Sequence, residues 1–143
     1  MSTMKTCFPS KAIATALLSC LIAPGLSQTP DSRWHMRVTD LHGQVKVEAT
    51  VRLTNDAAQS CMDAGWKRAA VEAKDAEAED FFPLATPSAY KLEGRVLTLG
   101  RTYLCHGYLF LKGIPDGPVI RGTFDAVGWG RKQLGAFSLQ EVP

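Results

Sequence analysis

The sequence predicts an all-β protein, a small antiparallel up-and-down β-barrel of about eight strands held by one disulfide. Three observations support this fold class. Apolar and polar residues alternate in several short segments, turn-forming residues separate these segments, and two of the four cysteines lie outside an apolar N-terminal stretch. Glycines within the expected strands and the absence of a long crossover favour a barrel over a two-sheet sandwich, because closure removes exposed strand edges.

The N-terminal stretch predicts export. Residues 1–27 carry two lysines, an apolar run over 12–23 and small residues before the expected cleavage point. This is the outline of a secretory signal peptide, because the run is too short to span a bilayer. Lipidation at Cys20 is the alternative, since residues 17–20 resemble the lipobox of bacterial lipoproteins. We therefore expect one mature domain, residues 28–143, that is periplasmic or secreted, and membrane-attached if Cys20 is lipidated.

The mature domain is electrically balanced. Of the 16 basic residues, Lys5 and Lys11 lie in the leader, so that 14 basic residues remain against 14 acidic ones. A neutral chain without a basic run argues against nucleic acid or an anionic membrane surface as the main partner.

Cys61 and Cys105 are the two cysteines of the mature chain. In an exported protein, two cysteines that are distant in sequence are expected to form a disulfide. A metal site is the alternative, but the sequence has no Cys-x-x-Cys motif and its three histidines are scattered. We predict neither a metal nor another cofactor.

A hairpin is predicted at the start of the domain. Residues 33–39 and 44–54 alternate apolar with polar positions on either side of a turn at 40–43, and a period of two gives each strand one buried and one solvated face. The apolar positions are Trp34, Met36 and Val38 in the first strand, and Val45, Val47, Ala49, Val51 and Leu53 in the second.

The next segment is expected to contain a helical turn and a third strand. Residues 54–56 can cap a helical turn over 57–59, which would deliver Cys61 to the bridge. Residues 66–73 alternate and predict a strand. The acidic, alanine-rich segment 72–80 is interpreted as a solvated helical turn or loop, with a surface for a basic partner as the alternative.

Phe81 and Phe82 are expected to plug one end of the core. Pro83 and Pro87 keep this stretch extended and outside the sheet. A lid over a ligand is the alternative interpretation.

The remaining chain predicts five further strands, with the centre of the sheet at residues 90–113. The expected strands are 90–93, 96–99, 102–111, 119–127 and 134–142. Gly107 would mark a bulge in the third of these, the residues from Lys112 to Pro118 would form a loop, and residues 128–132 would form a turn.

No catalytic motif stands in the chain, which is therefore predicted not to be an enzyme. Neither Gly-x-Ser-x-Gly, nor His-Glu-x-x-His, nor a phosphate-binding glycine loop is present. His35 is expected on a solvated strand face, His42 in a turn, and His106 on the strand face opposite Cys105. His106 is the best candidate for a catalytic histidine, with Asp116 or Asp125 to orient it.

Two short segments, Gly100 to Tyr103 and Tyr108 to Gly113, form a recognisable pattern in which an aromatic strand ends in Lys-Gly. Residues 99–113 thereby resemble the signature region of periplasmic and membrane-bound inhibitors of c-type lysozyme, which are small exported bacterial β-barrels. The resemblance implies that Lys112 enters the acidic cleft of the enzyme. Leu99 stands where that family has its other inhibitory residue, a Ser. The spacing from Tyr108 to Lys112 is one residue shorter than in the family pattern, and the cysteines fall at other places.

The best candidate for a partner-binding surface combines Tyr108 and the segment from Lys112 to Pro118 with the turn at Trp129 and Arg131. Two prolines would limit the entropy that this segment loses on docking. Trp and Arg are common anchors, and Lys112 could meet the carboxylates of a hydrolase cleft. The alternatives are that Lys112 keeps the barrel rim soluble and that Trp129 caps the barrel end.

The sequence thus predicts an exported binding or inhibitory protein that neutralises a protein partner, either a lysozyme-type cell-wall hydrolase or a toxin, as an immunity protein does. The first alternative is a lipocalin-like carrier of a small apolar molecule. An empty barrel would favour this alternative, with a cavity lined by Trp34, Val47, Val51 and Leu109. The second alternative is an enzyme with an unrecognised constellation.

Overall fold

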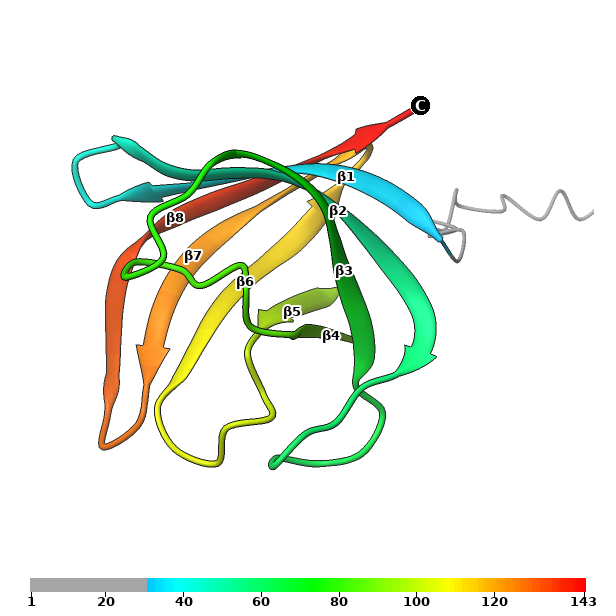
Figure 1. Ribbon diagram of the computed structural model, residues 1–143, viewed down its shortest axis with the longest axis vertical. Helices are drawn as coiled ribbons and strands as arrows, with labels where there is room; N and C mark the ends of the chain where they lie inside the picture. Colours follow the sequence, from blue (N-terminus) through cyan, green and yellow to red (C-terminus); the bar gives the residue numbers. More distant parts are fainter. Residues whose placement is uncertain (1–30) are drawn as a thin grey trace, which may run out of the picture.

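The computed structural model describes residues 31–143, which form eight antiparallel strands closed into a barrel (Figure 1). The strands are β1 (Ser32–Asp40), β2 (Val45–Ala57), β3 (Lys67–Ala76), β4 (Ser88–Glu93), β5 (Val96–Gly100), β6 (Tyr108–Asp116), β7 (Val119–Val127) and β8 (Arg131–Val142). Each strand pairs with the next, and β1 pairs with β8 to close the ring. The predicted fold class is confirmed. The predicted signal peptide and the lipidation at Cys20 lie outside the described residues.

The barrel interior is filled by apolar side chains from all eight strands. The inward positions predicted for the first hairpin are confirmed, with Val45 half-buried beside the turn and the others buried. Leu109 is half-buried and packs against the same core. Within residues 31–143 there is no α-helix, and hence none able to cross a membrane.

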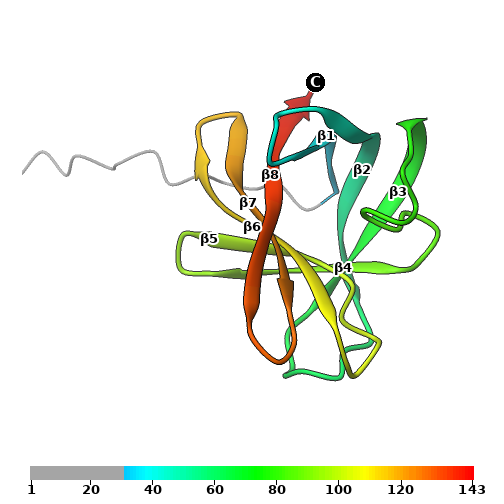
Figure 2. The same ribbon diagram turned by 90° about the vertical axis from the view of Figure 1, so that its left-hand side faces the viewer.

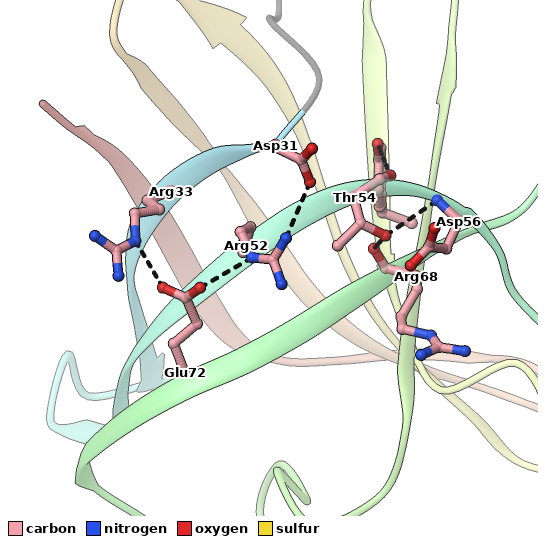
Figure 3. Close-up of polar contacts among 8 residues, drawn as sticks. Asp31, Arg33, Arg52, Thr54, Asp56, Arg68 and Glu72 are labelled. Atoms are coloured by element: carbon pink, nitrogen blue, oxygen red, sulfur yellow. Dashed lines mark hydrogen bonds and ion pairs between the residues drawn. The ribbon is translucent and has the colours of Figure 1, made fainter.

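The predicted helical turn at 57–59 is absent, because β2 continues through Ala57. Thr54, expected to cap that turn, instead ties β2 to β3. Its Oγ1 donates a hydrogen bond to the carbonyl oxygen of Arg68 at 3.1 Å and accepts one from the amide of Asp56 at 3.2 Å (Figure 3). A hydrogen bond to the neighbouring strand thus fixes the side chain of Thr54, which the local sequence alone would assign to a helix cap.

β3 extends to Ala76, so the helical turn or loop predicted over 72–80 is wrong for its first half. The Glu72 carboxylate accepts hydrogen bonds from Nε of Arg33 at 2.7 Å and from Nε of Arg52 at 2.9 Å (Figure 3). These bonds, with that from Arg33 the stronger cause, lower the pKa of Glu72. Opposite charges on neighbouring strands favour the extended conformation here.

The seam between β3 and β4 is the shortest in the barrel, with three residue pairs from Lys67 to Ala69. The segment that joins the two strands carries Phe81 and Phe82, whose rings meet that of Phe124 edge-on, with centroids 5.0 and 5.6 Å apart. Phe82 is fully buried. The prediction that these two rings pack into the core is confirmed.

The largest correction concerns β6, which was predicted over 102–111. Residues 101–107 form a loop, and β6 begins at Tyr108. Gly107, expected at a bulge, has φ of +73° and ends this loop. His106 is accordingly in an exposed loop and not on a strand face. The disulfide explains the shift, because Cys105 must leave the sheet to reach Cys61.

The predicted loop from Lys112 to Pro118 is also wrong, because β6 runs on to Asp116. Gly117, with φ of +58°, and Pro118 form a two-residue turn to β7. A glycine pair, Gly113 opposite Gly122, lies within these strands, and a Cβ at Gly122 would come within 2.0 Å of the Lys112 carbonyl oxygen. The glycines and the proline that suggested a loop thus lie in a sharply coiled pair of strands, in which the glycines allow a close backbone approach.

β8 begins at Arg131, three residues before its predicted start, and the turn is limited to residues 128–130. A register shift between Phe124 and Asp125 accommodates the extra residue on β8. This longer β8 places Arg131 within the sheet, opposite Val127.

Candidate functional site

Three connections gather at one end of the barrel. They are the β2–β3 loop (residues 58–66), the β5–β6 loop (101–107) and the β7–β8 turn (128–130), which lie together at the lower end in Figure 1 and Figure 2. We call this end the stapled end, because the predicted disulfide between Cys61 and Cys105 is formed here, with Cα atoms 5.1 Å apart.

Hydrogen bonds reinforce the staple. The amide of Cys61 donates to the carbonyl oxygen of Thr102 at 2.8 Å, and the buried Thr102 side chain donates back to the carbonyl oxygen of Gln59 at 3.2 Å. Two loops with no regular secondary structure are therefore fixed to each other. A surface built on them loses little conformational entropy when it binds.

A groove of about 720 Å³ runs over the outer wall of the barrel next to the stapled end. We call it the wall groove. Side chains from β4 to β8 and from the β2–β3 loop line it, including Trp66, Tyr108, Phe110, Lys112, Asp125 and Arg131. Three of the four residues predicted to bind a partner, Tyr108, Lys112 and Arg131, thus come together.

The register of the sheet explains this grouping. Tyr108, Phe110 and Lys112 alternate with inward-facing residues of β6 and so share its outer face. Phe110 pairs with Asp125 of β7, and Tyr108 pairs with Val127. Val127 in turn pairs with Arg131, which brings β8 to the same wall.

Aromatic rings form the floor of the wall groove. The Phe110 ring lies stacked between those of Tyr108 and Trp66, with centroids 5.5 and 6.0 Å away. Gly100 makes room for this stack, because a Cβ there would lie 2.8 Å from Cδ1 of Phe110 and 2.0 Å from the Leu109 carbonyl oxygen. The result is a second apolar cluster outside the barrel core.

Asp125 is a buried carboxylate at the edge of the wall groove, with 3% of its side chain exposed. Its Oδ2 accepts hydrogen bonds from Oγ1 of Thr123 at 2.7 Å and from Nη2 of Arg131 at 2.9 Å. Burial alone would raise its pKa, but these two bonds and the charge of Lys112 prevail and lower the pKa. Its Oδ1 is buried and has no hydrogen-bond partner among the described residues.

The other edge of the wall groove is acidic. Nζ of Lys91 pairs with the carboxylates of Asp63 and Glu93, the latter at 2.9 Å. The hydrogen bond from Lys91, followed by that from the Trp66 indole, lowers the pKa of Asp63. One ammonium between two carboxylates leaves this edge with a net charge of −1.

Trp129, the fourth predicted residue, stands apart from the wall groove. It occupies the tip of the β7–β8 turn and is 111% exposed relative to the reference residue. The alternative in which Trp129 folds back to cap the barrel is therefore wrong. The turn at Gly117 and Pro118 lies at the opposite end of the barrel from Trp129, so the predicted surface is divided between two ends (Figure 1).

The residues that the sequence suggested for general acid–base catalysis are not joined by hydrogen bonds. Asp125 pairs with Arg131 and has no bond to His106, which lies in the exposed β5–β6 loop. His35 lies on the first hairpin, where its Nε2 is 2.8 Å from Oε1 of Glu48 on the neighbouring strand β2. Within residues 31–143, no group of three His, Cys, Asp or Glu side chains is arranged to hold a metal ion.

Comparison of the chain with protein-family models, with curated proteins and with solved structures finds no match.

We expect Asp125→Asn to destabilise the protein in a pH-dependent way. The pKa of Asp125 is lowered by folding, so its ionised form adds stability above about pH 3.8, the ordinary value, and this contribution is lost as the pH falls through the folded-state pKa. At pH 7 the variant should lose roughly 1 to 2 kcal/mol in its free energy of unfolding. Urea unfolding at pH 7, 5, 4 and 3 should show the difference from wild type narrowing below pH 4.

Asp116→Asn is the matched control, since Asp116 is exposed beside the β6–β7 turn. It should change the free energy of unfolding by less than about 0.5 kcal/mol. A difference for Asp125→Asn that stays constant from pH 7 to pH 3 would show that the ionised carboxylate does not contribute.

Proposed function

We propose that this protein is an exported binding protein that neutralises a protein partner, as a hydrolase inhibitor or an immunity protein does, and that the partner docks at the stapled end. The observation that supports this most strongly is Trp129, a fully exposed indole at the tip of a short turn. Burial of this side chain against a partner would remove a large apolar surface from water and so favour binding.

The surroundings of Trp129 suit a protein interface. The disulfide and its hydrogen bonds hold the adjacent loops in place. Arg131 is 61% exposed and bonds Asp125 through one of its nitrogen atoms, which leaves further donors free for a carboxylate. Aromatic and Arg side chains around a rigid end are the composition of binding hot spots.

Lys112 supports an acidic partner surface. It is exposed in the middle of β6, on the outer wall, and forms no ion pair with any residue of the described chain. The side chain therefore projects from a rigid strand, where the sequence suggested a loop. A rigid strand presents an ammonium to a partner at a smaller entropic cost than a loop does.

The filled interior favours a protein partner over a small ligand held inside the barrel. Trp34, Val47 and Val51, the residues expected to line a carrier cavity, are packed in the core. A carrier needs an enclosed space of several hundred Å³. The outer wall and the stapled end are the surfaces that remain available for recognition.

Two substitutions test this proposal. The first candidate partner to test is a c-type lysozyme. We expect Trp129→Ala or Lys112→Ala to lower the affinity for the partner by about 2 kcal/mol or more, which is roughly 30-fold. Isothermal titration measures both variants after circular dichroism has confirmed their fold. Leu41→Ala is the matched control, because Leu41 is an exposed apolar residue on the β1–β2 turn. Full affinity in both test variants would contradict docking at the stapled end.

A further inference from the structure

We propose that the wall groove binds a short peptide with free termini, its carboxylate at Lys112 and Arg131 and its ammonium at Asp63 and Glu93. This small-ligand site goes beyond the proposed protein partner and does not depend on it. Charge, length and hydrogen-bonding capacity of the groove each point to this ligand class.

The two edges of the wall groove carry opposite net charges. Lys112 and Arg131 surround the single carboxylate of Asp125, which leaves a net charge of +1. At the other edge, Asp63 and Glu93 share the single ammonium of Lys91, which leaves −1. A ligand with one charge of each sign at its two ends matches this pattern, whereas an anion or a cation alone would be repelled at one edge.

The spacing of the two edges fits about three amino-acid residues. Lys91 pairs with Thr98, and Thr98 pairs with Lys112, so the two lysines lie two strands apart in one row. Two strand spacings amount to about 10 Å. Three residues of extended peptide span about 10 Å as well. A tripeptide therefore reaches from one edge to the other.

At the basic edge, Asp125 and Arg131 offer the bonding pattern of the last amide of the peptide. Oδ1 of Asp125 is a buried acceptor without a partner among residues 31–143, and an unpaired buried acceptor is unfavourable. Arg131 has unused donors beside it. A peptide group supplies an N–H for the first and a carbonyl oxygen for the second. Both side chains line the wall groove.

The aromatic floor suits the side chains of such a peptide. Tyr108 is the half-exposed end of the stack that Phe110 and Trp66 continue. An apolar or aromatic side chain at the second position of the peptide would pack against it, and an aromatic pair is more favourable than its buried area alone would give. We therefore use Ala-Phe-Ala as the probe.

The first test needs no substitution. Ala-Phe-Ala, its N-acetylated form and its C-amidated form are titrated into the full-length oxidised protein and followed by isothermal titration and by amide and indole NMR shifts. We expect each blocked form to bind at least tenfold more weakly than the free peptide, with shifts at the Trp66 indole and at Thr98. Equal affinity for the three peptides, or no binding at 10 mM peptide, would overturn the proposal.

The second test assigns the carboxylate. Lys112→Met should weaken the free peptide about tenfold and leave the C-amidated peptide unchanged, because the amide has no charge for Lys112 to bind. Lys46→Met, on β2 and outside the groove, is the matched control. Equal losses for both peptides would contradict the assigned orientation. Binding of an N-acetylglucosamine trimer in place of the peptide would assign the groove to carbohydrate and reject the proposal.

Neither test involves Trp129. A protein partner that still requires Trp129 while the peptide fails to bind would refute the peptide site and leave the proposed function standing.

Discussion

Val47→Asp will leave the barrel largely unfolded at 25 °C. Val47 is fully buried, lies opposite Val38 of β1, and has apolar neighbours in the core cluster. A carboxylate there has no partner, and burying it costs several kcal/mol in either protonation state. Because a domain of this size is stable by roughly 5 to 15 kcal/mol, this loss removes much or all of the folded population.

Circular dichroism and urea unfolding will measure this effect. Thr50→Asp is the matched control, since Thr50 lies on the same strand with its side chain toward the outer face. The control should lose less than about 1 kcal/mol in its free energy of unfolding. A Val47→Asp protein as stable as wild type would mean that the inward face of β2 is misassigned.

Removal of the disulfide is expected to have the second-largest effect, a loss of about 4 kcal/mol in the free energy of unfolding. Cys61 and Cys105 are 44 residues apart, and the chain-entropy estimate for a loop of that length gives this value. The folded state also loses the covalent link between the two loops of the stapled end. We therefore expect Cys61→Ser with Cys105→Ser to weaken partner binding as well as stability.

Urea unfolding of the double Ser variant and of wild type with and without reductant checks this prediction. Reductant should bring wild type to the stability of the double variant and should leave the variant unchanged. Reduced wild type with the stability of the oxidised protein would show that the bridge does not stabilise the fold.

Local sequence was sufficient to predict the strands that have one solvated face and one buried face. The hairpin of β1 and β2 shows this, because the alternation around Val47 and Ala49 specifies both strand and orientation. It was insufficient for β6. Its start was missed because Cys105 leaves the sheet to reach Cys61, and its end was missed because Gly113 and Pro115 are typical of a loop.

The prediction of the site was limited by strand pairing that local sequence does not reveal. Tyr108, Lys112 and Arg131 could be named because exposed aromatic and basic residues near turns are recognisable in sequence. The role of Asp125 could not, since its partner Arg131 becomes a neighbour through the start of β8, which the glycines around Trp129 concealed. The spacing of Thr123 and Asp125, two residues apart on β7, is the signal that places both on one face.

The short seam between β3 and β4 has a consequence for self-association. Beyond Ala69, β3 has no strand partner on its β4 side within residues 31–143, so its remaining residues could template a strand from another molecule. That stretch carries three charged residues within four positions, Glu72, Lys74 and Asp75. An incoming chain would have to desolvate these charges, and Glu72 is already engaged by Arg33 and Arg52. These charges disfavour the pairing of β3 with a strand of a second molecule.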